Sequence, residues 1–313
     1  MSGVTDIVMR RIAARYGAGL VVSEMVASDE FVRGSEEARL RAEGAGISPH
    51  VVQLAGCDPH WLGEAARLAE ANGAAIVDIN MGCPAKKVTG GWAGSALMRD
   101  LEHAVSLVEA AVAAVKIPVT VKMRLGWDDA SRNAPELARR AVASGAQMIT
   151  VHGRTRQQFY KGEADWAAIR AVRDVGAFPL VANGDIHDID DARNCLSRSG
   201  AGFVMIGRAA LGRPWLVGAI GAELDERPVP ALSLAQKMGD AREHYEGLLS
   251  LMGQAHGVRH ARKHLAAYAD DAAESGGAPD AELRRALLTS DNPRQVLEAL
   301  AGLFSTERSR AAA

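Results

Sequence analysis

A cysteine stands directly after an apolar run, between two residues that end regular structure. The run 76–80 is rich in β-branched residues and predicts a buried strand, and Gly82 and Pro84 end that strand on a short turn. Cys83 therefore faces whatever binds at the end of the strand, with lysines at 86–87 close by. The alternative is that its thiol is a small buried hydrophobe, as in most free cysteines.

Polar side chains also lie at the ends of nearly all the predicted strands. They are Ser23, Glu24, Gln53, Asn80, Lys122, Arg124, His152, Arg154, Arg156, Asn183, Asp185 and Arg208. The functional residues of a parallel α/β barrel come from the carboxyl ends of its strands. Burying many hydrogen-bonding groups at one rim carries a desolvation cost unless each is paired. These strand ends therefore predict the functional site.

The last two strand ends carry glycine turns, Asn183-Gly-Asp185 and Ile206-Gly-Arg208. Barrels of this kind often bind phosphate at this position through backbone N–H groups and a helix N-terminus. Arg208 would add a guanidinium to the phosphate oxygens. Two alternatives remain open, since isolated glycines are common in turns and Asp185 would also serve as a cap for the helix predicted over 188–196.

Lys122 is a charged residue inside an apolar run, 119–123. Strand alternation places it on the same face as Thr120. An ammonium group that points into a barrel needs an anion or hydrogen bonds. A reduced, anionic cofactor would supply the anion, and the alternative is an internal salt bridge with Glu24 or Asp78.

His152 leads into a basic loop that contains Arg154 and Arg156. A solitary histidine is more often structural than catalytic, but these neighbours favour contact with a ligand. No group of His, Cys, Asp and Glu in the sequence has convincing metal-ligand spacing. Neither a Gly-x-Ser-x-Gly motif nor a P-loop occurs, so the pattern supports neither a hydrolase nor an NTPase, and we predict no metal site.

Short apolar runs alternate with helical stretches along the chain, a pattern typical of a parallel sheet with connecting helices. These strands and helices must position the residues named above. The predicted strands are 20–22, 51–54, 76–80, 119–123, 148–151, 180–183 and 203–206. A closed barrel takes eight strands, whereas this chain opens with a helix over 7–16, capped by Thr5 or Asp6. We therefore predict an α/β fold, a (β/α)8 TIM barrel whose first strand is missing from this sequence.

A small all-helical domain is predicted after the barrel, because the breaker-rich stretch 225–230 is followed only by helical patterns. We expect the barrel domain over 1–229 and the helical domain over 230–313. The densest positive patch, 256–264, lies in the second domain and has a histidine at every fourth position. It favours phosphate contact, with a zinc site and a solvated helix face as the alternatives.

The composition is that of an ordinary globular protein. The 313 residues are 48% hydrophobic and 24% charged, with a net charge of −2, so binding to nucleic acid must rest on local patches. No apolar stretch approaches the ~20 residues that span a bilayer, and the N-terminus lacks a secretion signal, which predicts a cytoplasmic location. Cys57, Cys83 and Cys195 are an odd number without a CxxC pair, as expected for reduced thiols.

Taken together, these residues resemble the bacterial tRNA-dihydrouridine synthases, and the B-type branch in particular. The matching strings are Ser2-Gly-Val-Thr-Asp6, Val22-Ser-Glu-Met25, Gln53-Leu-Ala-Gly56, Asp78-Ile-Asn-Met-Gly-Cys-Pro-Ala-Lys-Lys87, Ala93-Gly-Ser-Ala-Leu97, His152-Gly-Arg-Thr-Arg156, Ala182-Asn-Gly-Asp185, Met205-Ile-Gly-Arg-Ala-Ala210, Arg213-Pro-Trp215 and Arg262-Lys-His264. They occur in order over almost the whole chain.

The resemblance implies an FMN-dependent barrel that reduces the C5=C6 bond of uridine in tRNA to 5,6-dihydrouridine, with NADPH as the reductant. Hydride would pass from the flavin to C6, and Cys83 would give a proton to C5. The residues implied to hold FMN are Ser2, Gln53, Lys122, His152, Asn183, Asp185, Gly207 and Arg208. We assign tRNA contact to Lys86, Lys87, Arg154, Arg156, Arg259, Arg262 and Lys263. No protein partner is implied, and we expect a monomer.

The N-terminus departs from the family pattern. Family members carry a strand and a Pro-Met pair ahead of Ser2, whereas this chain begins at that methionine, so either its start is assigned too late or the first strand is truly absent. Two alternative functions follow. One is a catalytically impaired tRNA-binding protein, and the other is a flavin barrel dehydrogenase acting on free pyrimidines, which would leave the helical domain unexplained.

Overall fold

The computed structural model describes residues 1–305 and divides the chain into two compact units. The first, which we call the sheet unit, consists of residues 1–2 and 20–208. The second, which we call the helical unit, consists of residues 3–19 and, within the described part of the chain, 209–305. The units do not follow the boundary expected at residue 229, because α1 (Ile7–Arg15) packs against α10 (Leu216–Leu224) and α11 (Leu234–Met252).

The sheet unit contains one parallel sheet. Its strands are β1 Val21–Ala27, β2 His50–Ala55, β3 Ile76–Met81, β4 Val119–Arg124, β5 Met148–His152, β6 Leu180–Asn183 and β7 Phe203–Met205. They lie in sequence order, and each pairs in parallel with the next. All seven predicted strands are therefore confirmed, and their carboxyl ends lie at one edge of the sheet.

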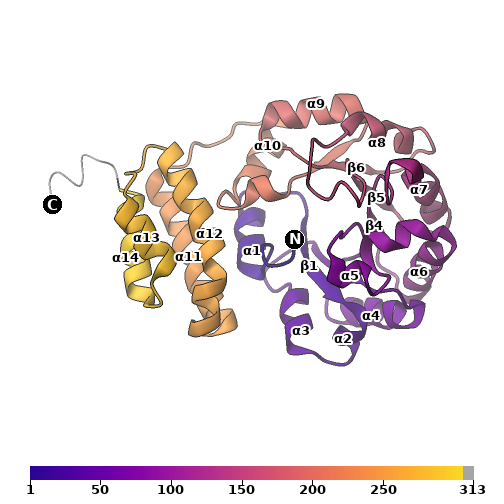
Figure 1. Cartoon of the computed structure of the whole chain (residues 1–313), viewed down its shortest axis with the longest axis horizontal. Coiled ribbons are helices and arrows are strands. Elements are labelled where there is room, and N and C mark those ends of the chain that lie inside the picture. The colour runs from indigo at the N-terminus through magenta and orange to yellow at the C-terminus, as the bar shows by residue number, and fades with distance from the viewer. Residues whose placement is uncertain (306–313) are drawn as a thin grey trace. The chain divides into compact units, whose positions relative to one another are not determined.

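Helices connect the strands and cover the outside of the sheet. They are α2 Ser28–Val32, α3 Glu36–Ala42, α4 Pro59–Ala71, α5 Lys86–Thr89, α6 Leu101–Ala114, α7 Ala134–Ala143, α8 Trp166–Arg173 and α9 Ile189–Ser199, with 3-10 turns at Gly94–Arg99 (η1) and Asp129–Ser131 (η2). Figure 1 shows α6, α7, α8 and α9 in an arc around β4, β5 and β6. Helices α4, α6 and α9 begin at Asp58, Asp100 and Asp188, whose carboxylates accept backbone N–H groups of the first turn.

The sheet is open between its first and last strands. Strands β1 and β7 are its two edges, and each pairs with a single neighbour. Phe203 on β7 is 58% exposed, and Leu20 just before β1 is 40% exposed. The prediction of a (β/α)8 barrel is thus confirmed only in part, because the seven strands curl into a TIM-barrel-like half-barrel (Figure 1).

The helical unit gathers α1 and α10 with the C-terminal helices. The latter are α11, α12 Gln254–Glu274, α13 Ala281–Thr289 and α14 Pro293–Leu303, preceded by a 3-10 turn, η3 Arg208–Ala210. Tyr245, Leu265 and Leu300 are among the buried residues of its core. The helical character predicted for the C-terminal region is confirmed, and the N-cap of α1 is Asp6, one of the two residues expected to cap it. No helix among the described residues is long and apolar enough to cross a membrane.

Candidate active site at the strand ends

The turn that carries Cys83 is held on both sides by hydrogen bonds. Asn80 Oδ1, at the end of β3, accepts the N–H groups of Cys83 at 2.9 Å and Gly82 at 3.2 Å. Ser95 donates its hydroxyl to the carbonyl of Cys83 at 2.9 Å. The side chain of Cys83 is half-buried, so the thiol is positioned on a fixed turn and is not a sealed core residue. Cys195, in contrast, is fully buried, and burial raises the pKa of its thiol to about 12.

A buried network extends this turn across three strands. Asn80 donates to Gln53 Oε1 at 2.8 Å, and Gln53 donates to Asp78 Oδ2 at 2.7 Å. Thr120 donates its hydroxyl to the other oxygen of Asp78 at 2.6 Å. Burial raises the pKa of Asp78 to about 6, although these hydrogen bonds oppose the change. The network therefore fixes Gln53 and the Cys83 turn through one buried carboxyl group.

Lys122 lies on the inner face of β4, as the alternation predicted. Its Nζ donates to Asn183 Oδ1 at 3.1 Å, and the amide nitrogen of Asn183 donates in turn to the carbonyl of Met205 at 2.8 Å. Asp78, one of the two carboxylates considered as a salt-bridge partner, is held instead by Gln53 and Thr120. Burial is the main cause that lowers the pKa of Lys122 to about 8.

His152 is buried at the end of β5 and has an unused ring nitrogen. Within the described part of the chain, no group hydrogen-bonds to its Nδ1. Burial, together with the charges of Lys122 and Arg124, lowers the pKa of His152 to about 2, so the ring is neutral at physiological pH. Gly184 has φ +119°, and a Cβ there would lie 2.9 Å from this ring, so only glycine fits beside it.

Asp185 holds two arginines. Its carboxylate accepts from Arg154 Nη1 at 2.9 Å and from Arg208 Nη2 at 3.1 Å, and it also accepts the N–H of Ala164 at 2.9 Å. Burial by itself would raise the pKa of Asp185, but these hydrogen bonds and guanidinium charges outweigh it, and the pKa lies below its ordinary value. The alternative of a helix cap is wrong, because Asp188 caps α9.

Arg154 does not lie where a tRNA contact was expected. Its side chain is 2% exposed, and its guanidinium also donates to the carbonyls of Lys161 and Gly162. It therefore fixes Asp185 and is not available to a phosphate at the surface. Lys86 and Lys87 are exposed on α5, as expected for a surface contact.

Three further residues predicted to bind the cofactor, Ser2, Gly207 and Arg208, lie where the two segments of the sheet unit, 1–2 and 20–208, end. Ser2 is exposed, and Gly207 follows β7. The sulfur of Met1 lies 3.5 Å from the point that a Cβ on Gly207 would occupy, so the N-terminus reaches the end of β7. Arg208 is 58% exposed, and its guanidinium lies 4.8 Å from the centre of the Tyr160 ring.

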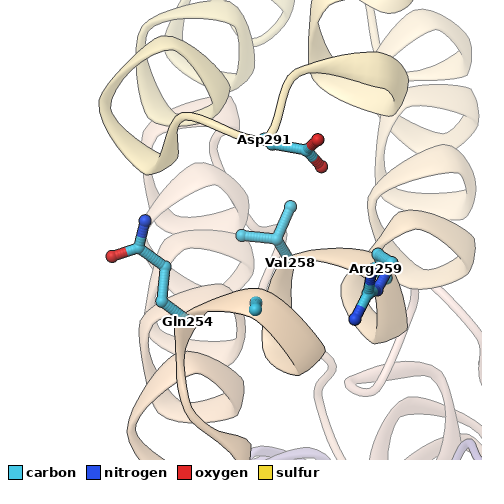
Figure 2. A pocket seen from close by; sticks show the side chains of 5 residues that line it. Gln254, Val258, Arg259 and Asp291 are labelled. Atoms are coloured by element: carbon cyan, nitrogen blue, oxygen red, sulfur yellow. The ribbon is translucent and has the colours of Figure 1, made fainter.

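The positive patch of the helical unit is partly neutralised. Arg259 and Lys263 are exposed on α12, but Arg262 pairs with Asp291 at 2.8 Å. The sequence showed no acid near this patch, because Asp291 comes from the turn between α13 and α14. A hollow of about 390 Å³ is lined by Asp291, Gln254, Ala255, Val258 and Arg259. Figure 2 shows the side chains of Asp291 and Arg259 among those around it. One carboxylate and one guanidinium in its lining give the hollow no net preference for a charge.

Sequence reasoning missed a buried cluster in the helical unit. His244 Nε2 hydrogen-bonds with Asp6 Oδ2 at 2.9 Å, and His264 Nε2 lies 3.9 Å from the same oxygen. The zinc alternative for the histidines at 256, 260 and 264 is not supported, since the one group of potential metal ligands found among residues 1–305 is Asp6, His244 and His264. Their pairing spans more than two hundred residues, so no local pattern signals it.

The fold and these strand ends define the class of the protein as an α/β half-barrel with a cation-rich polar rim and a positioned thiol. The profile of the dihydrouridine synthase (Dus) family matches residues 1–307, and the chain belongs to this family. The family predicted from the sequence is thereby confirmed.

Individual proteins agree with this assignment. The chain is 53% identical over 296 residues to a probable tRNA-dihydrouridine synthase of Rhizobium leguminosarum bv. phaseoli, covering 95% of this chain and 90% of that one. It is 48% identical over 277 residues to tRNA-dihydrouridine synthase B of Xanthomonas axonopodis pv. citri, covering 88% and 83%. A solved structure of 2-naphthoyl-CoA reductase is similar with a TM-score of 0.52 and 14% identity, over 72% of this chain and 47% of that one, which shows a likeness of fold alone.

Proposed function

We propose that this chain is a tRNA-dihydrouridine synthase that reduces the C5=C6 bond of uridine in tRNA to 5,6-dihydrouridine. The family match and relatives near 50% identity over most of the chain support this function. The observation that carries the mechanism is the fixed turn of Cys83, whose N–H and carbonyl are both hydrogen-bonded while its side chain stays half-buried. A tRNA substrate also agrees with a cytoplasmic location.

FMN is the cofactor that we assign to the strand ends. The residues present suit it, because His152 keeps a buried nitrogen that no group in the described part of the chain hydrogen-bonds, and Lys122 and Arg208 place positive charge around it. We assign FMN binding to Ser2, Gln53, Lys122, His152, Asn183, Asp185, Gly207 and Arg208, with Asp185 acting through its hold on Arg208. When bound, FMN would supply the hydride for C6 of uridine after reduction by NADPH.

The residues of the chain then have distinct roles in the reaction. Cys83 would give its proton to C5 of the uridine, because a thiol on a rigid turn is a suitable general acid. Lys122, with a pKa of about 8, stays mostly protonated at neutral pH and would hold a negative charge on the cofactor. Since a uridine inside a stack cannot reach a buried cofactor, the base has to leave its stack before reaction.

The finer assignments follow from the same features. The matching strings and the Xanthomonas relative support the B-type branch. We assign cofactor binding to residues 1–229 and much of the tRNA binding to residues 230–313, of which 306–313 lie outside the described part. The tRNA contacts assigned are Lys86, Lys87, Arg156, Arg259, Arg262 and Lys263, all with side chains at least partly exposed.

The open edges of the sheet support an eighth strand. Among residues 1–305, strands β1 and β7 each pair with a single neighbour, and Phe203 and Leu20 expose apolar surface there. A strand supplied by residues ahead of Met1 would pair with both edges and complete the (β/α)8 barrel. A longer form of the chain should then bind FMN more tightly and melt higher than residues 1–313. Equal FMN affinity and equal melting of the two forms would contradict this assignment.

The function is tested by incubating the purified protein with FMN, NADPH and tRNA that lacks dihydrouridine. We expect nucleoside mass spectrometry to find dihydrouridine, which is two hydrogens heavier than uridine, at one or a few positions. A yellow protein that consumes NADPH only with free pyrimidines would favour the dehydrogenase alternative. A colourless protein that binds tRNA would favour the catalytically impaired one.

A further inference from the structure

Four side chains of the sheet unit form an aromatic and cationic surface, and only one of them, Arg156, has been assigned a function above. The guanidinium of Arg99 lies over two indole rings, 5.3 Å from the centre of Trp92 and 4.9 Å from that of Trp127. Arg156 lies over Trp127 as well, at 4.8 Å. We call Trp92, Arg99, Trp127 and Arg156 the Trp–Arg surface. Such close pairs of arginine and indole are favourable cation–π contacts.

Hydrogen bonds tie this surface to the Cys83 turn. On one side, Ser95 in η1, which lies between Trp92 and Arg99 in the chain, donates to the carbonyl of Cys83. On the other side, the N–H of Arg156 donates to the carbonyl of Gly126 at 3.0 Å, next to Trp127.

Arg124 joins the two sides. Its Nε donates to the carbonyl of Gly82 at 2.8 Å, and its Nη1 donates to the carbonyl of Thr155 at 2.9 Å. The residues before Cys83 and before Arg156 are thus held by one guanidinium. The Trp–Arg surface therefore has a defined position relative to the thiol.

Trp92 is the exposed end of this surface. Its side chain is 61% exposed, although a large apolar ring in water is unfavourable for a folded protein. Its backbone has φ +60°, a conformation that residues with a bulky side chain rarely adopt and that occurs preferentially at functional sites. Its N–H donates to the carbonyl of Thr89, the last residue of α5, which also carries the exposed Lys86.

The charge of the surface indicates an anionic ligand with flat rings. Arg156 Nε has no hydrogen-bond partner among residues 1–305, and Lys86 and Lys87 are exposed on the neighbouring helix. Single-stranded RNA is bound by stacking of its bases on aromatic side chains and by cations along its phosphates. An apolar peptide would leave these cations unpaired, so nucleic acid fits the surface better.

We propose that the Trp–Arg surface binds an unstacked nucleotide of the tRNA next to the target uridine. The base stacks on the free face of Trp92, and Arg99, Arg156 and Lys86 contact the adjoining phosphates. This inference rests on the proposed function, since it assigns the surface to the same tRNA that brings uridine to Cys83. It adds a site that binds a neighbouring nucleotide of the tRNA and so keeps the RNA unstacked once the uridine has left its stack.

The experiment compares Trp92→Ala and Trp92→Phe with the parent. Stacking of a base on an aromatic ring accounts for roughly a ten- to hundredfold change in affinity on substitution by alanine. We expect Trp92→Ala to raise the KM for tRNA by about that factor, with a much smaller effect on kcat at saturating tRNA, and Trp92→Phe to recover most of the affinity. Trp61→Ala is the matched control, because Trp61 also pairs with an arginine, Arg33, at 5.1 Å, but lies on α4.

Direct binding separates this inference from the proposed function. The Kd for unmodified tRNA is measured without NADPH, and FMN content and melting temperature show whether each variant folds. If Trp92→Ala does not fold, Arg99→Gln decides the question through its Kd value. Parental affinity in folded Trp92→Ala or, failing that, in Arg99→Gln overturns the Trp–Arg surface. Weakened binding in Trp92→Ala, together with a parent that never forms dihydrouridine, overturns the proposed function and leaves the surface standing.

Discussion

Two buried histidines, one in each unit, differ in the charges around them. Burial lowers the pKa of both His152 and His264 to about 2, so both rings are neutral. His152 is surrounded by the cations of Lys122 and several arginines, and its Nδ1 has no partner among the described residues. His264 lies beside the carboxylate of Asp6. Burial alone therefore does not distinguish the two histidines; the charges around them do, because His152 lies among several cations at the strand ends and His264 lies next to an acid.

The largest effect is expected from the reacting group at the strand ends. Cys83→Ala should retain FMN and lower the rate of dihydrouridine formation by roughly 10²- to 10⁴-fold, the usual contribution of general acid catalysis. Cys57→Ala is the matched control, because Cys57 is also half-buried and follows a strand. Single-turnover assays with reduced enzyme measure the step. Parental rates in Cys83→Ala would remove Cys83 from the mechanism and make Cys57 the next candidate.

The second prediction tests the positive charge of Lys122 directly. Lys122→Met should weaken FMN binding by roughly 10- to 100-fold, since the variant cannot donate a hydrogen bond from a charged group. In the parent, FMN affinity should fall as the pH rises above about 8, because Lys122 loses its proton there, and the variant should lose this pH dependence. Titration of FMN fluorescence measures both. Lys116→Met, which removes an exposed lysine, is the control.

The helical unit should respond to pH through its buried histidine. The pKa of His264 is about 2 in the folded chain and about 6.5 in the unfolded chain. As the pH falls from 7 to 5, the His264 ring therefore gains a proton only in the unfolded chain. The contribution of His264 to the free energy of unfolding is therefore fully present above pH 6.5, and it should decrease by about 2 kcal/mol between pH 7 and pH 5. Urea unfolding at several pH values measures the slope. His264→Asn should reduce the slope and His256→Asn, at an exposed position, should not.

The smallest effect concerns the patch on α12. Replacing Arg259, Arg262 and Lys263 with alanine should weaken tRNA binding and flatten its salt dependence, by somewhat less than one unit of log–log slope for each cation that no longer meets a phosphate. Because Arg262 already pairs with Asp291, Asp291→Asn should strengthen binding slightly by releasing that guanidinium. Parental affinity and salt slope in the triple variant would show a solvated helix face, with tRNA held at the sheet unit alone.

Much of the fold could be predicted because it depends on short-range patterns. Each buried strand is an apolar run in the sequence, and the helix predicted over 7–16 is observed at Ile7–Arg15, because the capping side chain of Asp6 acts on the turn that directly follows it. The turn of Cys83 was predicted for the same reason, because Gly82 and Pro84 end the strand wherever it lies. Lys122 was placed on the correct face because alternation along a strand is a local rule.

Partners distant in sequence could not be predicted in this way. The assignment of Arg154 to tRNA failed because its partner, Asp185, lies on a different loop, 31 residues away. Asp291 neutralises Arg262 from 29 residues away. In both cases the sequence identified a cation correctly and could not show the acid that meets it, since electrostatic pairing depends on distance in space.

The sequence by itself determined the seven strands, the helices between them, the polar strand ends and the family of the protein, because these are properties of local pattern and of strings in order. The tertiary structure alone decided which cations stay free and which are paired, that the first helix packs with the C-terminal ones, and that Trp92, Arg99 and Trp127 meet. The physical reason is that burial and side-chain pairing arise only when segments far apart in the chain come together, and no short-range pattern encodes that meeting.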